Sequence, residues 1–490
     1  MEEGSSETNV TQPLLSNKEQ DKTPSCKENR HDQEHSNGSS GHHDIHSETY
    51  VAYKTRWYIL AIFSLLYAFQ ANAWNAWGPI AGTVQVVLQW SQAEIDLCIN
   101  WGPVSYVTAG LFFSYILTIK GFRFALIASA LFLLSGTAIR CLPVGIENIK
   151  WTANIGQVFI GLSAPILQSA PTHLSAIWFP PHQRTTSTAI AGSAGCLGLA
   201  LSFVLGSNVV PTLPKSITAD NITAVQRETY FNSIMNLLYI QCAMIAVIVI
   251  VALLYLPDNP PTPPSVSATE KREGFVAGTK ALIKSASFWI PALSYSVSTG
   301  IYVGWDTQLV LIFDSALGVT QTTVGWIGFY TNIAATIGTL VLGIFVDFLG
   351  GHMKLVLLVA MLGLVGNCVW CVLLSMHYIQ FSKASLYISC IAIGFFANAP
   401  IPLYFEVTVE GMYPIAEGTV NIWMGWLNNA FMLIFVLLPQ ILPGIGVQWL
   451  NWVFLVAVIL CLPLLLAYKE KYKRFDLDTR DEINAASDKE

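Results

Sequence analysis

Two stretches decide the fold: Gly161–Thr188 reads GLSAPILQSAPTHLSAIWFPPHQRTTST, and Gly394–Asn421 reads GFFANAPIPLYFEVTVEGMYPIAEGTVN. Each begins with a Gly/Pro-rich apolar run, passes through an aromatic and proline turn, and continues into a polar loop with a threonine that opens the next apolar run. The two stretches lie 233 residues apart, the separation of Gly161 and Gly394. Because their identity is low, position and pattern carry the comparison, and they predict two similar halves.

The runs around this repeat are long and apolar. Of 490 residues, 53% are hydrophobic and only 11% are charged, which is typical of a protein that crosses a membrane many times. The runs are continuous rather than alternating, so a β-barrel is excluded. We expect twelve transmembrane helices, which begin near Trp57, Glu94, Phe124, Trp151, Thr185, Ser233, Trp289, Thr323, Lys354, Ala384, Pro414 and Trp449.

The repeat offset divides these helices into two groups of six. The expected halves are residues 51–256 and 288–468, and the proline-rich, then charged stretch 257–287 joins them as a cytosolic linker. Residues 1–50 are polar and should form a disordered cytosolic tail, and 469–490 form a second tail. An all-α membrane protein with six plus six helices in parallel repeat is the plan of the major facilitator superfamily fold.

Lysine and arginine predict the orientation, because they gather in cytosolic loops. With a cytosolic N-terminus, fourteen of them face the cytosol and five face the other side, so we expect both termini in the cytosol. The fourteen are Lys54, Arg56, Lys120, Arg123, Arg184, Lys271, Arg272, Lys280, Lys284, Lys354, Lys469, Lys471, Lys473 and Arg474, and the five are Arg140, Lys150, Lys215, Arg227 and Lys383.

Two short signals concern trafficking. Leu14 and Leu15 form a dileucine in the first tail and predict a sorting signal read by clathrin adaptor complexes, although Val10 stands where an acidic residue is expected and chance is the alternative. The first apolar run follows more than fifty residues, so no cleavable signal peptide is expected. Of three sequons, only Asn221 falls outside the cytosol in this topology, which makes it the predicted glycosylation site.

We expect no metal and no cofactor. Cys368 and Cys371 have metal-ligand spacing, but a lone pair inside an apolar run is better explained as small core residues. The tail histidines fix no ligand geometry. Walker motifs and nucleophile–base pairs are missing from the sequence, so an enzyme is not expected, and nothing indicates a nucleic-acid partner.

Several strings resemble solute carrier family 49, the major facilitator family of the feline leukaemia virus subgroup C receptor proteins. They are WNAWGPI (Trp74–Ile80), GTAIRCLP (Gly136–Pro143), SAIWFPPHQRTTSTAIA (Ser175–Ala191), GWIGFY (Gly325–Tyr330) and FEVTVEGMYPIAEGT (Phe405–Thr419). The resemblance covers all twelve expected helices and is strongest to a lysosomal member. It implies a lysosomal membrane transporter that exports pyridoxine, vitamin B6, by proton-driven alternating access. Relatives carry choline or ethanolamine, and haem has been proposed. The remaining alternative is a receptor or scaffold that kept the transporter fold.

Two tryptophans are candidate substrate contacts. Trp74 lies 17 residues past Trp57, about 25 Å along its helix, and Trp305 lies 16 residues past Trp289, about 24 Å along the repeat partner. At equal depth they could sandwich a flat or cationic ring, with Asn75 and Asp306 bonding its rim. In the choline-carrying relatives, a tryptophan matching Trp74 stacks on the substrate. The alternative is an interfacial aromatic belt.

Polar residues inside the expected helices are further candidates. A carboxylate there is costly, about 2.5 to 3.5 kcal/mol on insertion scales, so Asp306 is a candidate proton acceptor or counter-ion, the alternative being an idle aspartate at a watery mouth. Asn429 lies near the position of a binding amide in the choline-carrying relatives. Nine amides together predict a polar central path, although most should serve as contacts between helices. They are Gln70, Asn72, Asn100, Gln157, Gln168, Asn332, Asn398, Asn428 and Asn429.

A charged gate is predicted at the cytosolic side. Arg184 in the first half and Glu406, Glu410 and Glu417 in the second occupy related parts of the repeat, which favours an ion-pair gate over loop acids in water. Asp347 lies in GIFVDFLG, which resembles the major facilitator loop signature and allows the aspartate to cap a helix N-terminus.

Overall fold

The computed structural model describes residues 53–211, 213–214, 217–262, 264, 274–319, 321–349, 352–441 and 448–470. They belong to one unit, Thr49–Glu490, and every element described in it is helical. The first half contains α1 (Thr55–Trp74), α2 (Ala81–Val87), α3 (Gln92–Lys120), α4 (Phe122–Arg140), α5 (Gly145–Ser169), α6 (Pro171–Trp178), the 3-10 turn η1 (Pro181–Gln183), α7 (Arg184–Val209) and α8 (Ala224–Leu254). The second contains α10 (Phe275–Lys284), α11 (Ala286–Thr307), α12 (Leu309–Leu317), α13 (Gln321–Leu349), α14 (Met353–Ser375), α15 (Lys383–Asn398), α16 (Ile401–Met412), α17 (Glu417–Ile441) and α18 (Leu450–Ala467).

The two quoted stretches fold alike. In the first, α5 stops at Ser169, α6 begins with Pro171, and a turn leads into α7. In the second, α15 stops at Asn398, α16 follows Pro400, and a turn leads into α17. Proline has no N–H and crowds the preceding turn, so it interrupts a helix but is tolerated in the first turn of the next. Both stretches therefore build a broken helix followed by a long one.

Twelve helical segments follow the expected starts: α1, α3, α4, α5 with α6, α7 and α8, then α11, α13, α14, α15 with α16, α17 and α18. Eight segments in the described part are long and apolar enough to cross a membrane by length and composition. The largest boundary error is at α8, which begins at Ala224 rather than near Ser233. Thr223 and Gln226 form a capping box there, which starts the helix in polar sequence ahead of the apolar run.

Three short helices, α2, α10 and α12, were not expected from the apolar runs. Helix α10 lies within the stretch predicted as a linker, and its Thr279 accepts a hydrogen bond from Trp423 of α17. Each of the three is ten residues long or less, too short to span a membrane.

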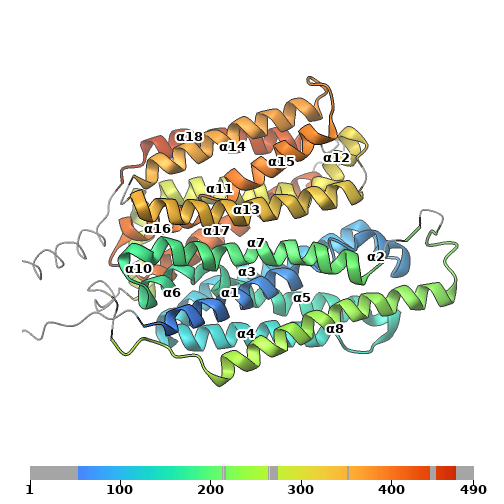
Figure 1. Cartoon of the computed structure of the whole chain (residues 1–490), viewed down its shortest axis with the longest axis horizontal. Helices are drawn as coiled ribbons and strands as arrows, with labels where there is room; N and C mark the ends of the chain where they lie inside the picture. The colour runs from blue at the N-terminus through green and yellow to red at the C-terminus, as the bar shows by residue number, and fades with distance from the viewer. Residues whose placement is uncertain are drawn as a thin grey trace, which may run out of the picture. The chain divides into compact units, whose positions relative to one another are not determined.

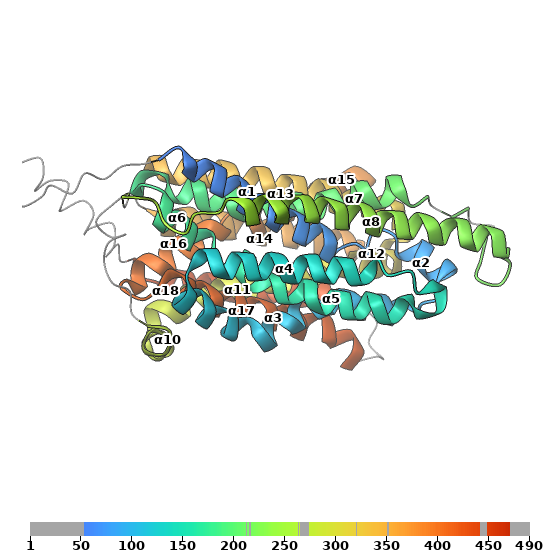
Figure 2. The same cartoon turned by 90° about the horizontal axis from the view of Figure 1, so that it is seen from below.

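Each half has its own core, and the two most extensive contacts between the halves are helix pairs. The largest apolar cluster comes from the second half, around Trp305 and Phe454, while a separate cluster around Phe63 and Phe122 comes from the first. Helix α7 packs against α13, and α3 packs against α17. Figures 1 and 2 show these long helices running side by side along one direction.

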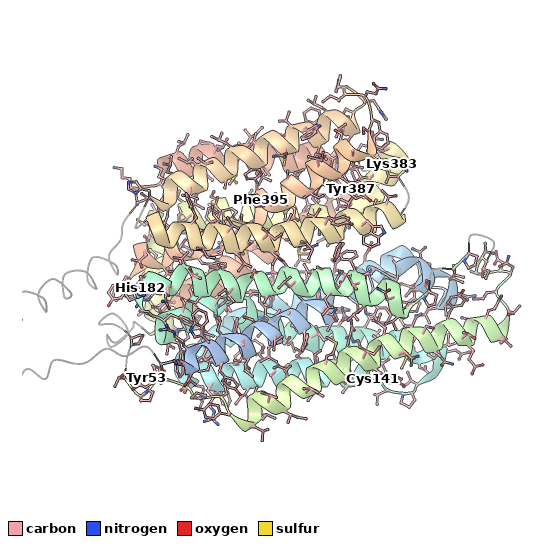
Figure 3. All side chains as sticks on the ribbon, viewed as in Figure 1. Tyr53, Cys141, His182, Lys383, Tyr387 and Phe395 are labelled. Carbon is pink, nitrogen blue, oxygen red and sulfur yellow. The ribbon has the colours of Figure 1, made fainter. Side chains whose placement is uncertain are left out.

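The two ends of the bundle are named here by what lies at them. The Arg184 end holds the starts of α1 and α7, together with α6, α10 and α16, and the α2 end holds α2 and α12 (Figure 1). Figure 3 places Tyr53 and His182 at the Arg184 end and Lys383 and Tyr387 at the α2 end.

Candidate functional site

A cavity of about 180 Å³ lies between the two halves. Four aromatic side chains and five amides contribute to its wall, and none of its lining residues carries a charge. The aromatic residues are Tyr67, Trp74, Tyr295 and Phe405, and the amides are Gln70, Gln168, Asn398, Asn428 and Asn429. Apolar walls with a few convergent polar groups are typical of small-molecule sites.

Trp74, one of the predicted contacts, lines this cavity as the last residue of α1. Its indole Nε1 donates to the carbonyl of Ile99 over 2.9 Å, and the ring packs so closely on Gly102 that a Cβ there would overlap it. Because the N–H already has an acceptor inside the protein, Trp74 can offer the cavity its ring face. That geometry suits stacking or a cation–π contact.

Trp305 does not line the cavity with Trp74. The side chain is 1% exposed in the core of the second half, where its Nε1 donates to Asn451 over 2.7 Å and its ring packs against Phe454. The cavity face of α11 is formed by Tyr295, Thr299 and Val303. Each residue turns a helix by about 100°, so a side chain two positions past Val303 points to nearly the opposite side. The expected sandwich of Trp74 and Trp305 is therefore not present in this structure.

Asn75 and Asp306 are not part of the cavity wall. The Asn75 amide nitrogen donates to Ser202 of α7 over 2.9 Å, which ties the end of α1 to that helix. Asp306 is half-buried near the end of α11, and its buried Oδ1 has no hydrogen-bond partner in the described structure. The carboxylate nevertheless lies within electrostatic range of Cys196, a cavity residue of α7.

Asn429, a candidate substrate contact, also lines the cavity. It is 7% exposed, and its amide nitrogen donates to the carbonyl of Gly425 over 2.8 Å and to Gln168 over 3.4 Å. Gln168 belongs to the first half and Asn429 to the second, so the hydrogen bond between these amides joins the two halves at the cavity wall.

Three aromatic wall residues, Tyr67, Tyr295 and Phe405, were missed by sequence reasoning. They come from α1, α11 and α16 and are separated by long stretches of chain. One signal was available for two of them, because Tyr67 and Tyr295 stand on the same helices as Trp74 and Val303, at helical spacings of seven and eight residues.

Hydrogen bonds join the halves between the cavity and the Arg184 end. Thr188 of α7 donates to Glu406 of α16 over 2.9 Å, and its hydroxyl oxygen also lies 3.0 Å from that of Ser175 of α6. The side chain of Asn421, one turn into α17, donates to the carbonyl of Ser169 over 2.9 Å and also bonds the Thr172 hydroxyl. These contacts bind the broken helix of each half to the other half.

The predicted gate residues gather at this end and are buried. Arg184, Glu406, Glu410 and Glu417 are all 5% exposed or less, so the alternative of acids solvated in loops does not hold. His173 of α6 stands 3.8 Å from Glu417, close enough to form an ion pair if protonated. Asp347 lies near the end of α13, and its side chain falls outside the described structure.

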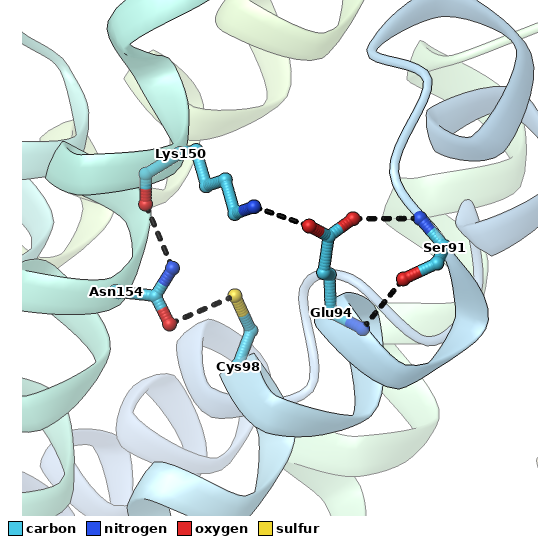
Figure 4. A network of polar contacts seen from close by, with 5 residues as sticks. All are labelled: Ser91, Glu94, Cys98, Lys150 and Asn154. Carbon is cyan, nitrogen blue, oxygen red and sulfur yellow. Dashed lines mark hydrogen bonds and ion pairs between the residues drawn. The ribbon is translucent and has the colours of Figure 1, made fainter.

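A polar network fastens α3 to α5 at the α2 end (Figure 4). Ser91 and Glu94 form a capping box at the start of α3, and Glu94 pairs with Lys150 of α5. One turn along α5, Asn154 accepts from the Cys98 thiol and also from the Trp101 indole, over 2.8 Å. Helices α3 and α5, which both carry cavity residues, are thus held together up to the depth of the cavity.

Arg140, one of the five loop charges expected opposite the cytosol, is instead 1% exposed inside the bundle at the end of α4. Asn221 is exposed beyond α7, where its side-chain oxygen accepts from the Thr218 N–H over 2.6 Å.

Leu14 and Leu15 lie outside the described residues. Cys368 and Cys371 are buried in the core of the second half.

Comparison with known proteins gives the chain's relatives. The Major Facilitator Superfamily profile matches residues 63–435. The "Solute carrier family 49 member 4 homolog" of Xenopus tropicalis is 32% identical over 430 residues, which are 86% of this chain and 93% of the relative. The "Choline/ethanolamine transporter FLVCR1" of Mus musculus is 25% identical over 392 residues, 76% of this chain and 67% of the relative.

A solved structure has a similar fold. The crystal structure of the major facilitator transporter FucP in its outward conformation aligns with a TM-score of 0.65 at 14% identity, over 84% of this chain and 99% of FucP. At this identity the likeness shows the fold alone, and it agrees with the predicted all-α fold of the superfamily.

Proposed function

The chain belongs to the major facilitator superfamily and, within it, to solute carrier family 49, and from this premise we propose that it exports pyridoxine from the lysosomal lumen to the cytosol, driven by protons. The superfamily membership makes it a multi-pass membrane transporter rather than an enzyme. Its substrate, driving force and location are the proposal.

The uncharged, aromatic and amide-lined cavity is the observation that carries this proposal. Pyridoxine is a flat pyridine ring with hydroxyl groups around its rim. The ring suits the face of Trp74, and the hydroxyls suit amides such as Asn429 and Gln168, which can both donate and accept. A cavity of about 180 Å³ suits a single-ring solute and is small for haem.

Choline or ethanolamine is the second candidate. Four aromatic rings line the cavity, and a cation gains most from ring faces. The mouse relative is named a choline/ethanolamine transporter. Val303 stands where choline-carrying relatives place a tyrosine, so α11 presents an aliphatic side chain to the cavity at that position. This difference favours pyridoxine.

Asp306 is the proposed proton-coupling residue. Its Oδ1 is buried without a hydrogen-bond partner in the described structure, and a charged group in such a place is costly unless it is paired. In an acidic lumen, protonation would neutralise it when the cavity is accessible from that side. The same group could balance the charge of a pyridinium form of the substrate.

The Arg184 end is the proposed cytosolic gate. Two hydrogen bonds join the halves between the cavity and the Arg184 end, one from Thr188 to Glu406 and one from Asn421 to Ser169. Alternating access would break these bonds when the halves rock apart. With both termini in the cytosol, the α2 end and Asn221 face the lumen, so we propose glycosylation of Asn221 and sorting to lysosomes through Leu14 and Leu15.

The direct test is uptake of radiolabelled pyridoxine by cells that express the Leu14→Ala, Leu15→Ala double variant. Loss of the sorting signal should place the protein at the plasma membrane, where the outer medium replaces the lumen. We expect saturable uptake that is faster at pH 5 than at pH 7.4. Excess choline should not abolish this uptake. Asp306→Asn should remove the dependence on pH.

Three outcomes would count against the proposal in different ways. Absence of pyridoxine uptake, with surface expression established by biotinylation, removes pyridoxine and directs the same assay to choline and ethanolamine. Uptake that is equal at both pH values removes proton coupling. Asp306→Asn with an unchanged pH response assigns the coupling to another residue.

A further inference from the structure

The last turn of α1 ends inside the first half, and its backbone carbonyls have no following turn to bond them. A helix leaves its last four carbonyls without partners within the helix, and a buried carbonyl that stays unpaired is costly. Here the last four belong to Ala71, Asn72, Ala73 and Trp74. Only the Ala71 carbonyl is bonded by the chain that follows, through the Asn75 N–H over 3.1 Å.

The other three are bonded by side chains from three different helices. Arg140 of α4 donates through Nη1 to the Ala73 carbonyl over 2.9 Å. Gln157 of α5 donates to the Trp74 carbonyl over 3.0 Å, and Gln241 of α8 donates to the Asn72 carbonyl over 3.2 Å. All the carbonyls of the last turn therefore have a donor.

Arg140 also orders the two glutamines. Its Nη1 donates to the Gln157 side-chain oxygen over 3.0 Å, and its Nη2 donates to that of Gln241 over 3.3 Å. With its oxygen accepting from arginine, each amide turns its nitrogen toward α1, since an amide carries the acceptor and the donors on opposite sides. Exposure is 1% or less for all three side chains. We call them the α1 clamp.

The charge of Arg140 is compensated without an acid. Among the residues described, no carboxylate forms an ion pair with it, and its Nε has no hydrogen-bond partner. The negative end of the α1 dipole and its carbonyls stand in place of an anion. A buried arginine is expensive, so its presence at the end of α1 indicates a specific use.

The packing leaves Arg140 a defined path to α1. Helices α4 and α5 approach so closely that a Cβ on Gly156 would lie 2.5 Å from the Cγ of Arg140 and 2.6 Å from the carbonyl oxygen of Gly136. The arginine stem therefore passes over a glycine, and the guanidinium reaches α1 in a fixed position. Only a residue without a side chain leaves this room on α5.

The clamp acts on the residue that faces the cavity. Gln157 holds the Trp74 carbonyl and also donates to the Cys98 carbonyl over 3.1 Å, while the Trp74 indole donates to the Ile99 carbonyl. Backbone and ring of Trp74 are thus fixed from two sides. We propose that Arg140 is a positioning residue for substrate recognition, which sets the end of α1 and through it the ring of Trp74 on the cavity wall.

This inference rests on the proposed function only for its substrate. Arg140→Lys keeps the charge but places all its N–H donors on one nitrogen, so it cannot bond Ala73, Gln157 and Gln241 together as the planar fork does. We expect the apparent KM for pyridoxine to rise about tenfold, equivalent to about 1.4 kcal/mol, with little change in maximal rate. In the purified full-length protein, amide hydrogen exchange of the last turn of α1 should become faster.

Arg227→Lys is the matched control. Arg227 of α8 donates from Nε to the carbonyl of Val87 at the end of α2 over 2.7 Å, so it is also an arginine at a helix end. The variant should speed exchange in α2 and leave the KM unchanged. Should Arg140→Lys fail to fold, Gln241→Glu tests the same claim, because it keeps an acceptor for Nη2 and removes the donor to the Asn72 carbonyl.

Each result decides something. Faster exchange in α1 together with a higher KM supports the positioning role. An unchanged KM despite faster exchange would reduce Arg140 to a structural cap, and a higher KM with unchanged exchange would mean that it acts elsewhere; either result overturns the proposal. If the wild-type protein transports no pyridoxine, choline or ethanolamine, the proposed function fails, while unchanged exchange at α1 would still refute the clamp by itself.

Discussion

The ends of α1 and α11 occupy related places in the two halves, yet they treat a tryptophan in opposite ways. Trp74 closes α1 and presents its ring to the cavity, whereas Trp305 is 1% exposed and bonds Asn451 in the core. The repeat offset of 233 residues explains the difference, because it relates Trp74 to Thr307 and not to Trp305. A shift of two residues turns a helical side chain by about 200°.

The comparison teaches that depth along a helix and direction around it are separate properties. Counting residues from the start of each apolar run placed both rings at a similar depth. Only the repeat register, checked against the residues that line the cavity, gives their directions. Trp74 should therefore matter for the substrate and Trp305 for stability, and four substitutions test that division.

Trp305→Ala should have the largest effect, on stability. Removing a fully buried tryptophan costs about 3–5 kcal/mol, and Asn451 would also lose its bond to the indole. We expect a lower thermal unfolding temperature and a lower amount in the membrane, measured in detergent and by surface labelling. Molecules that do fold should keep the wild-type KM. A variant of normal stability with a raised KM would place Trp305 in the substrate site.

Trp74→Ala should act on recognition instead. Loss of the ring face should raise the KM for the transported solute about tenfold, or about 1.4 kcal/mol, while the unfolding temperature falls far less than in Trp305→Ala. Trp74→Phe keeps a ring face, so its KM should lie between those of the wild type and Trp74→Ala. Uptake kinetics corrected for surface amount measure this. An unchanged KM in Trp74→Ala would leave the tryptophan without a role in binding.

Asn429→Leu should separate the two candidate substrates. An apolar side chain of similar size removes a hydrogen-bond partner for hydroxyl groups, which is worth about 1 kcal/mol, so the KM for pyridoxine should rise about fivefold. Choline binding depends on its ammonium group and should change less. Parallel uptake of both labelled solutes makes the comparison. Equal losses for both would show that Asn429 shapes the cavity rather than reading a hydroxyl group.

Val303→Tyr should have the smallest effect, and it should strengthen the binding of a cation rather than weaken binding. It places an aromatic ring on the cavity face of α11, opposite to where Trp305 points. A second ring is worth about 0.5–1 kcal/mol to a cation, so choline or ethanolamine should compete with pyridoxine about threefold better. Competition curves measure the shift. Weaker competition by both cations would mean that the added ring fills the cavity.

Much of the fold was accessible from sequence because it is encoded in long patterns. The apolar runs and the repeat of Gly161–Thr188 and Gly394–Asn421 predicted the helix, the aromatic and proline turn and the long helix that follows in each half, but not the break within the helix before the turn. Helices α2, α10 and α12 were not predicted, because a helix of ten residues or less has no apolar run of membrane-spanning length.

The site was less predictable, because its residues meet only in three dimensions. Trp74 and Asn429 line the cavity, and resemblance to relatives had singled out both. Tyr295 and Phe405 carry no local signature, since an aromatic residue in an apolar helix looks the same on either face. The expectation that Arg140 is a loop charge is wrong, because sequence shows its place at a helix end but not the close approach of Gly156 on α5 that lets it turn inward.

The central claim is that the cavity beside Trp74 holds the transported solute, and the native thiol of Cys196 on its wall can report on this directly. The measurement is the alkylation rate of Cys196 in purified full-length protein, followed by mass spectrometry with Cys141 as the internal control outside the cavity. We predict that pyridoxine slows alkylation of Cys196 but not of Cys141, and that Trp74→Ala weakens this protection while Trp305→Ala leaves it intact. Equal Cys196 rates with and without saturating pyridoxine, choline and ethanolamine would contradict the assignment of the cavity as the substrate site.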